Sequence, residues 1–179
     1  MTTEASDEQL ELRAEAASTV TSTEESRAFF QARLSMFGFY VFVLAGGSWA
    51  ALAVVYLAGP GSGPGVHRID SIGSMLHLGN ALLAGALWLA TRRGRRRGEL
   101  LHALDLGTSL GLVAIWGVTG LTLPDPTVGG FVSLLSFNLG VLARAIVVPS
   151  TSRRTLVIGA LGATIIVALA LLRGVPGQS

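Results

Sequence analysis

Residues 34–58 read LSMFGFYVFVLAGGSWAALAVVYLA, a stretch without a single charged side chain. A helix needs about 20 apolar residues to cross the hydrocarbon core of a bilayer. Backbone N–H and C=O groups must be paired within the segment when it lies in lipid, so this stretch predicts a transmembrane helix. The alternating polarity of a membrane β-strand is absent. Four similar stretches follow, at about 72–91, 100–123, 129–148 and 155–172.

The composition of the whole chain supports this interpretation. Half of the 179 residues are apolar and 13% are charged, whereas soluble domains carry about 25% charged residues. A soluble globule could not cover the remaining residues with polar surface, which excludes a soluble enzyme or a nucleic-acid-binding protein. The predicted fold class is therefore an all-α integral membrane bundle of five transmembrane helices.

Three regions are predicted along the chain. Residues 1–33 are acidic and contain no short apolar core followed by a cleavage site, so they indicate a partly disordered cytoplasmic tail and not a secretory signal. Residues 34–174 form the transmembrane domain. Residues 175–179 form a short extracytoplasmic tail.

The orientation follows from the arginines, because positively charged loops stay on the cytoplasmic side. Five of them lie between the second and third predicted spans, and they are Arg92, Arg93, Arg95, Arg96 and Arg97. We interpret this loop as a topogenic anchor on anionic lipid and not as a nucleic-acid site. The N-terminus is then cytoplasmic and the C-terminus extracytoplasmic. All 13 basic residues are arginine, which suggests a GC-rich bacterial genome. The expected location is the bacterial cytoplasmic (inner) membrane, with several passes.

Two charges fall inside the predicted spans, Asp105 and Arg144. Each lies about five residues from the cytoplasmic end of its helix, so the equal depth favours an ion pair between neighbouring antiparallel helices. His102 precedes Asp105 by three residues and shares its helix face. These three residues form a predicted intramembrane polar cluster. It is either a structural contact or a group that responds to protons or a signal, and Arg144 could instead snorkel to the headgroups.

Small residues recur at the spacing of helix contacts, where they let backbones approach closely. Asn80 and Asn138 are candidates for hydrogen bonds between helices. We expect the small residues to pack within the bundle, with a dimer face as the alternative. The predicted packing positions are Gly46, Gly47, Gly107, Gly111, Gly159 and Ala163.

No catalytic, cofactor or metal site is predicted. Cysteine is absent, and no paired carboxylates or Ser/His/Asp set stands on the loops. His77 and His102 lie near opposite ends of their helices, about 15–20 Å apart along the membrane normal, so one metal cannot bridge them. Each is expected to be interfacial or locally hydrogen-bonded. The glycine-rich segment 59–65 lacks the Gly-Lys-Ser/Thr ending of a phosphate-binding loop.

Three stretches together resemble the N-terminal multi-span membrane region of bacterial, myxobacterial-type membrane serine/threonine protein kinases and related signalling proteins. They are ESRAFFQARLSMFGFYVFVL at 25–44, LLHALDLGTSLGL at 100–112 and LARAIVVPSTSRRTLVIGALGA at 142–163. The resemblance covers about 25–172 and implies an input, anchoring or dimerising region with no catalytic residues to transfer. The chain has no kinase glycine-rich loop, catalytic lysine or HRD-type loop.

The sequence thus predicts a non-enzymatic membrane sensor or anchor module, either part of a truncated or split gene product or a stand-alone relative. The alternative is a small transporter or channel subunit, for which mid-membrane polar residues and internal symmetry would be expected. The expected partners are the lipid bilayer and either a second copy of the chain or a cytoplasmic signalling protein, and nucleic acid is not among them.

Overall fold

The computed structural model describes residues 4–58, 71–123, 125–148 and 152–173, and over these residues it is helical without a strand. Each of the five helices is long and apolar enough to cross a membrane, which confirms the predicted fold class. The four later helices begin and end within three residues of the predicted spans. The helices are α1 (Glu4–Ala58), α2 (Ile72–Thr91), α3 (Gly98–Thr122), α4 (Pro126–Val147) and α5 (Ser152–Arg173).

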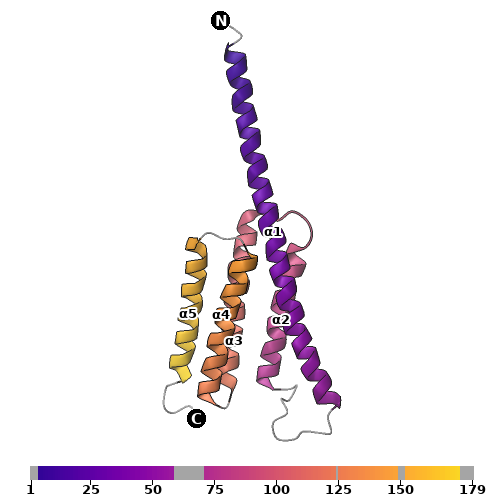
Figure 1. Ribbon diagram of the computed structural model, residues 1–179, viewed down its shortest axis with the longest axis vertical. Helices are drawn as coiled ribbons and strands as arrows, with labels where there is room; N and C mark the ends of the chain where they lie inside the picture. The colour runs from indigo at the N-terminus through magenta and orange to yellow at the C-terminus, as the bar shows by residue number, and fades with distance from the viewer. Residues whose placement is uncertain (1–3, 59–70, 124, 149–151, 174–179) are drawn as a thin grey trace.

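The first helix differs from the predicted partly disordered tail. It runs without interruption from Glu4 to Ala58, over 55 residues, or about 80 Å at the rise of an α-helix. Residues 4–37 contain neither glycine nor proline and are rich in alanine and glutamate, which have high helix propensity. Figure 1 shows the N-terminal half of α1 extending beyond the other four helices. The predicted tail is therefore largely a continuation of the first helix.

Side-chain caps mark where α2 and α4 begin. The Ser71 hydroxyl accepts a hydrogen bond from the Ser74 N–H at 3.2 Å and caps α2. The Asp125 carboxylate accepts from the N–H groups of Thr127 and Val128 at the start of α4. Between α2 and α3, Gly94 has a φ of +73°, a conformation that other residues rarely adopt. The starts of α2 and α4 and the turn between α2 and α3 thus carry local sequence signals.

The helices pack around α3, which contacts all four others, while α1 packs mainly along α2 (Figure 1). One end of the bundle carries the 92–97 turn together with the start of α5, and we call it the arginine-rich end. A core cluster there joins α1, α2, α3 and the residue that follows α4. Its buried members are Leu34, Phe37, Leu87, Leu101 and Val148.

Two of the predicted small-residue positions meet a neighbouring helix. A Cβ at Gly46 would lie 3.8 Å from the Ala81 Cβ, and one at Gly111 would lie 2.8 Å from Leu83 Cδ2. The other four predicted positions do not pack closely against a neighbouring helix. The reason is that helical spacing identifies a face of a helix but does not show whether that face meets another helix. A Cβ would meet nothing within 4 Å at three of them, and the fourth is exposed: Gly47, Gly107, Gly159 and Ala163.

The closest backbone approaches lie elsewhere. A Cβ at Gly38 would lie 2.9 Å from the Trp88 backbone nitrogen and 3.0 Å from the Ala84 carbonyl oxygen. A Cβ at Gly120 would lie 2.6 Å from the Gly129 carbonyl oxygen. These two glycines let α1 approach α2 and α3 approach α4.

Candidate functional site

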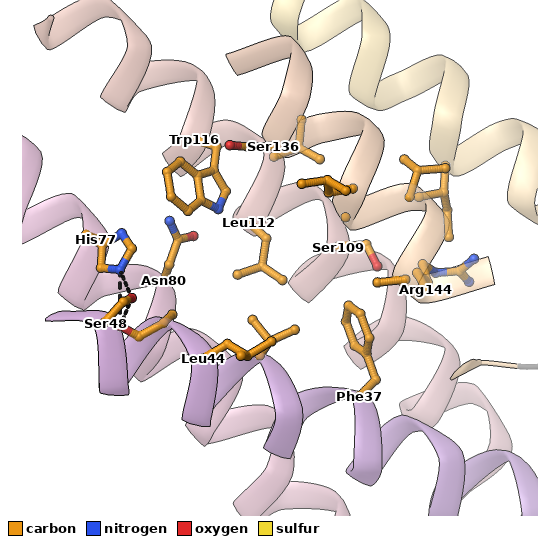
Figure 2. Close-up of a pocket in the computed structure, with 18 residues that line it drawn as sticks. Phe37, Leu44, Ser48, His77, Asn80, Ser109, Leu112, Trp116, Ser136 and Arg144 are labelled. Carbon is orange, nitrogen blue, oxygen red and sulfur yellow. Dashed lines mark hydrogen bonds between the residues drawn. The ribbon is translucent and has the colours of Figure 1, made fainter. Parts of the chain in front are cut away.

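A cavity of about 400 Å³ is lined by residues of α1, α2, α3 and α4 and by Ile158 of α5, and Figure 2 labels ten of its lining residues. It begins beside Phe37, where the core cluster of the arginine-rich end stops. Most of its wall is apolar, and α1 contributes one side of it. The larger apolar residues of the wall are Phe37, Val41, Leu44, Leu112, Trp116 and Leu139.

Two polar side chains on this cavity have no hydrogen-bond partner. Asn80 is 1% exposed, and neither its Nδ2 nor its Oδ1 is bonded. Ser109 is also buried, and its hydroxyl oxygen is unbonded. Asn80 is the ninth of 20 residues in α2 and Ser109 the twelfth of 25 in α3, so both lie near mid-depth, where lipid offers no water. Figure 2 shows Leu112 between them.

His77 and Ser48 form a separate contact on the wall. The His77 Nε2 lies 2.8 Å from the Ser48 hydroxyl and 3.1 Å from the Ala45 carbonyl oxygen (Figure 2). The Trp116 ring meets the His77 ring edge-on, with centroids 5.4 Å apart. The imidazole is therefore held by α1 and α3 and does not reach His102.

The structure brings Asp105 and Arg144 together beside the cavity. The Arg144 Nε donates to Asp105 Oδ1 at 3.0 Å, and its Nη2 donates to Oδ2 at 2.6 Å. Their relative exposures are 1% for Asp105 and 2% for Arg144. This two-point geometry is the strongest form of an arginine–carboxylate pair. Arg144 also lines the cavity, so the pair joins α3 to α4 at the cavity wall.

Arg154, at the start of α5, joins the same carboxylate. Its Nη2 lies 3.1 Å from Asp105 Oδ2 and donates to the His102 carbonyl oxygen at 3.0 Å. Its Nη1 contacts the His102 ring. The Phe30 ring lies 5.5 Å from the guanidinium carbon and 5.1 Å from the His102 ring centroid. We call Asp105, Arg144, Arg154 and His102 the polar cluster. Arg154 was not part of the cluster predicted from the sequence.

Gln31 of α1 holds the turn between α2 and α3. Its Nε2 donates to the carbonyl oxygens of Thr91 at 2.8 Å and Gly94 at 2.6 Å. Its Oε1 accepts from the Arg96 N–H at 3.1 Å. Arg27, one turn earlier, donates to the Arg96 carbonyl oxygen at 3.3 Å. Gln31 was not predicted from the sequence, because its partners are backbone groups.

The five arginines of the predicted topogenic loop all lie in or beside this turn. The Arg96 side chain turns back to donate to the Ala90 carbonyl oxygen at 2.8 Å. The Arg92 guanidinium lies over the Trp88 ring, 4.7 Å from its centroid. Arg95 forms an exposed ion pair with Glu24 of α1 at 3.4 Å. Arg93 and Arg97 are exposed at the surface of the turn.

Two further features complete the candidate sites. Asn138 is exposed and donates to Leu134 of its own helix at 2.8 Å, so this bond does not connect two helices. Within the described parts of the chain, no three His, Asp or Glu side chains are grouped as metal ligands. A second hollow, between α3, α4 and α5, is lined by glycines, apolar residues and Ser133, whose hydroxyl donates to the Trp116 carbonyl oxygen at 3.4 Å.

No protein-family model matches the chain, and neither a curated protein nor a solved structure matches it. The features of the chain that bear on function are therefore the cavity, the polar cluster and the long first helix.

Proposed function

We propose that the chain is a non-enzymatic sensor and anchor module of a bacterial cytoplasmic membrane, similar in role to the membrane region of a receptor-type serine/threonine kinase. One observation carries this proposal. Helix α1 forms one wall of the cavity and continues as the same helix beyond the bundle (Figure 1). A change in the cavity can therefore reach the arginine-rich end through a single rigid element.

The contacts of α1 suit such a role. Phe37, Val41 and Leu44 face the cavity, and Gln31 binds the α2–α3 turn two helical turns before Phe37. A displacement of α1 at the cavity would pull directly on these hydrogen bonds. Because they connect to backbone atoms, the turn would move with the helix.

The polar cluster holds α3, α4 and α5 together, so that α1 can move relative to them. Asp105 binds Arg144 and Arg154, so it connects α3 with α4 and α5. Helix α1 reaches this cluster through the aromatic ring of Phe30. Charged contacts buried between three helices resist separation, whereas a ring contact can slide at lower cost.

The proposed orientation places the arginine-rich end in the cytoplasm. The bias of arginines toward this end supports it, since positively charged loops near membrane spans are retained on the cytoplasmic side. The N-terminal half of α1 then lies in the cytoplasm, where a signalling partner or a second copy of the chain could bind it.

Spin labels test the sensor role without knowledge of the ligand. The chain contains no cysteine, so Ser26→Cys on α1 and Leu156→Cys on α5 place two unique labels at exposed positions. Ser136→Phe, on the cavity wall of α4, mimics occupancy. We expect this substitution to shift the label-to-label distance distribution in lipid nanodiscs, measured by double electron–electron resonance.

The matched control is Leu135→Phe, which adds a ring to the adjacent, exposed residue of α4. It should leave the distance distribution unchanged. Equal distributions for Ser136→Phe and the parent would contradict the sensor role. Solute or ion flux through liposomes that contain the purified chain would instead favour the transporter or channel alternative.

A further inference from the structure

We propose that the cavity binds an uncharged amphiphile, a mainly apolar molecule with a hydroxyl group that both donates and accepts a hydrogen bond, and that this molecule enters from the bilayer. The inference rests on the proposed sensor function and names the chemical class of its input. Its basis is the pair of unbonded polar side chains, Asn80 and Ser109, on one apolar cavity.

The unbonded atoms define what the ligand must offer. The Asn80 amide presents a donor at Nδ2 and an acceptor at Oδ1, and the Ser109 hydroxyl can do both. Buried polar groups are nearly always hydrogen-bonded, and each exception calls for a specific explanation. A hydroxyl group can accept from Nδ2 and donate to Oδ1, whereas a hydrocarbon chain can do neither. The unbonded Asn80 amide therefore favours an alcohol over an acyl chain.

The wall of the cavity sets the charge and size of the ligand. Arg144 is its one charged residue, and it is engaged by the Asp105 carboxylate at two points. The wall thus carries no uncompensated charge that would attract an ion. The volume of about 400 Å³ lies within the range of about 300–1,000 Å³ that is typical of small-molecule sites. An uncharged, largely apolar molecule fits both limits.

The route of entry follows from which wall residues reach the surface. Leu44 of α1 is 73% exposed and Leu139 of α4 is 57% exposed, and both line the cavity. At the arginine-rich end, the buried core cluster, which includes Phe37 of α1 and Val148 just after α4, fills the space between the helices. The cavity is therefore accessible between α1 and α4 along a face of exposed leucines, which borders lipid and not water.

The test uses Trp116, whose ring lines the cavity. In a chain with Trp49→Phe and Trp88→Phe, Trp116 is the one remaining tryptophan. Undecanol with bromine at the far end of the chain and bromoundecane differ by one hydroxyl group, and bromine quenches tryptophan fluorescence. Both are titrated into nanodiscs, as mole fractions of the lipid. We expect saturable quenching at an alcohol content about five- to tenfold below that of the bromoalkane, as one to two hydrogen bonds would give.

Two variants identify the site of this selectivity. Asn80→Leu replaces the amide by an apolar group of similar size and should bring the two titrations together. Ser133→Ala, in the second hollow, should leave the selectivity unchanged. Because Asn80 has no partner in the protein, Asn80→Leu should also keep or raise the thermal unfolding midpoint without alcohol and remove the increase that alcohol causes in the parent.

Three results would overturn the inference. They are equal quenching by the two compounds in the parent, unchanged selectivity in Asn80→Leu, and a large loss of thermal stability in Asn80→Leu without alcohol. The failure of this inference can be distinguished from the failure of the proposed sensor function. Absent selectivity together with a Ser136→Phe distance shift overturns this inference alone. Selective binding without any movement of α1 overturns the sensor role alone.

Discussion

Arg144 and Asp105 are 39 residues apart in the sequence and meet in a two-point ion pair, with N–O distances of 3.0 and 2.6 Å. Both side chains are almost fully buried. Neither charge can be rehydrated where it stands, so the loss of one partner would leave the other uncompensated. The contact also connects α3 to α4 next to the cavity, as a buried ion pair between two helices.

Removal of either partner of this ion pair should destabilise the protein. We expect Asp105→Asn and Arg144→Gln each to lower the free energy of unfolding by about 3–5 kcal/mol. The double variant should lose less than the sum of the two, because the same interaction is lost only once. Chemical unfolding in mixed detergent micelles, followed by circular dichroism, measures all three values.

The exposed pair between Glu24 and Arg95 is the control for this cycle. Its two side chains are 50% and 83% exposed, and exposed pairs are worth at most about 1 kcal/mol. Glu24→Gln should therefore have a small effect or none. Strict additivity of the Asp105 and Arg144 substitutions would refute an energetic coupling between them.

Depth along the helices was sufficient to predict that Asp105 and Arg144 could pair, because both lie about five residues from the same bundle end. It was insufficient for Arg154, since the sequence does not state on which side of α3 the last helix packs. Gln31 carries no signal at all, because an uncharged side chain that binds backbone groups looks like any surface glutamine. Asn80 was predicted to form a hydrogen bond between helices, but the structure shows that neither polar atom of its amide has a partner.

Gln31 should anchor the first helix to the α2–α3 turn. Its three hydrogen bonds end at Thr91, Gly94 and Arg96, and each is worth about 0.5–1.5 kcal/mol. We expect Gln31→Leu to lower the free energy of unfolding by about 1–3 kcal/mol, given the partial exposure of the site. Amide hydrogen exchange at Arg96 should accelerate, which mass spectrometry or NMR can follow.

The neighbouring exposed residue supplies the control. Ala32→Gln adds an amide side chain to the exposed side of α1 and should change neither stability nor exchange. Unaltered exchange at Arg96 in Gln31→Leu would mean that the turn holds its shape without α1, and the proposed link between cavity and turn would lose its support.

Gly38 should tolerate no side chain. A Cβ there would lie 2.9 Å from the Trp88 backbone nitrogen and 3.0 Å from the Ala84 carbonyl oxygen, and backbone atoms cannot turn aside as a side chain can. We expect Gly38→Ala to cost about 1–3 kcal/mol in unfolding free energy. At Gly107, where a Cβ would meet nothing within 4 Å, the same change should be neutral or stabilise by up to about 1 kcal/mol through helix propensity. Equal thermal shifts for the two variants would be incompatible with the close approach of α1 to α2.

Glycines also show how much of a membrane bundle can be predicted from sequence patterns. Long uncharged stretches determine that helices form and approximately where they end, because lipid permits little else. Small residues recur on several faces of such helices, and their spacing is the same whether a face meets protein or lipid. Gly107 and Gly111 illustrate this, since Gly111 packs against Leu83 while Gly107 has no neighbour within 4 Å.

Cysteine labelling in whole cells should determine the orientation of the bundle. Ser26 lies on α1 at the arginine-rich end and Thr127 lies in the first turn of α4 at the opposite end, and both are exposed. The proposed orientation puts Thr127 outside the cell and Ser26 inside. In a bacterial host, Thr127→Cys should therefore react with a membrane-impermeant maleimide in intact cells, whereas Ser26→Cys should react only after the membrane is opened. The parent chain, which has no cysteine, is a built-in blank. Labelling of Ser26→Cys in intact cells would contradict the proposed orientation. The long extension of α1 would then lie outside the cell, where a cytoplasmic signalling partner could not bind it.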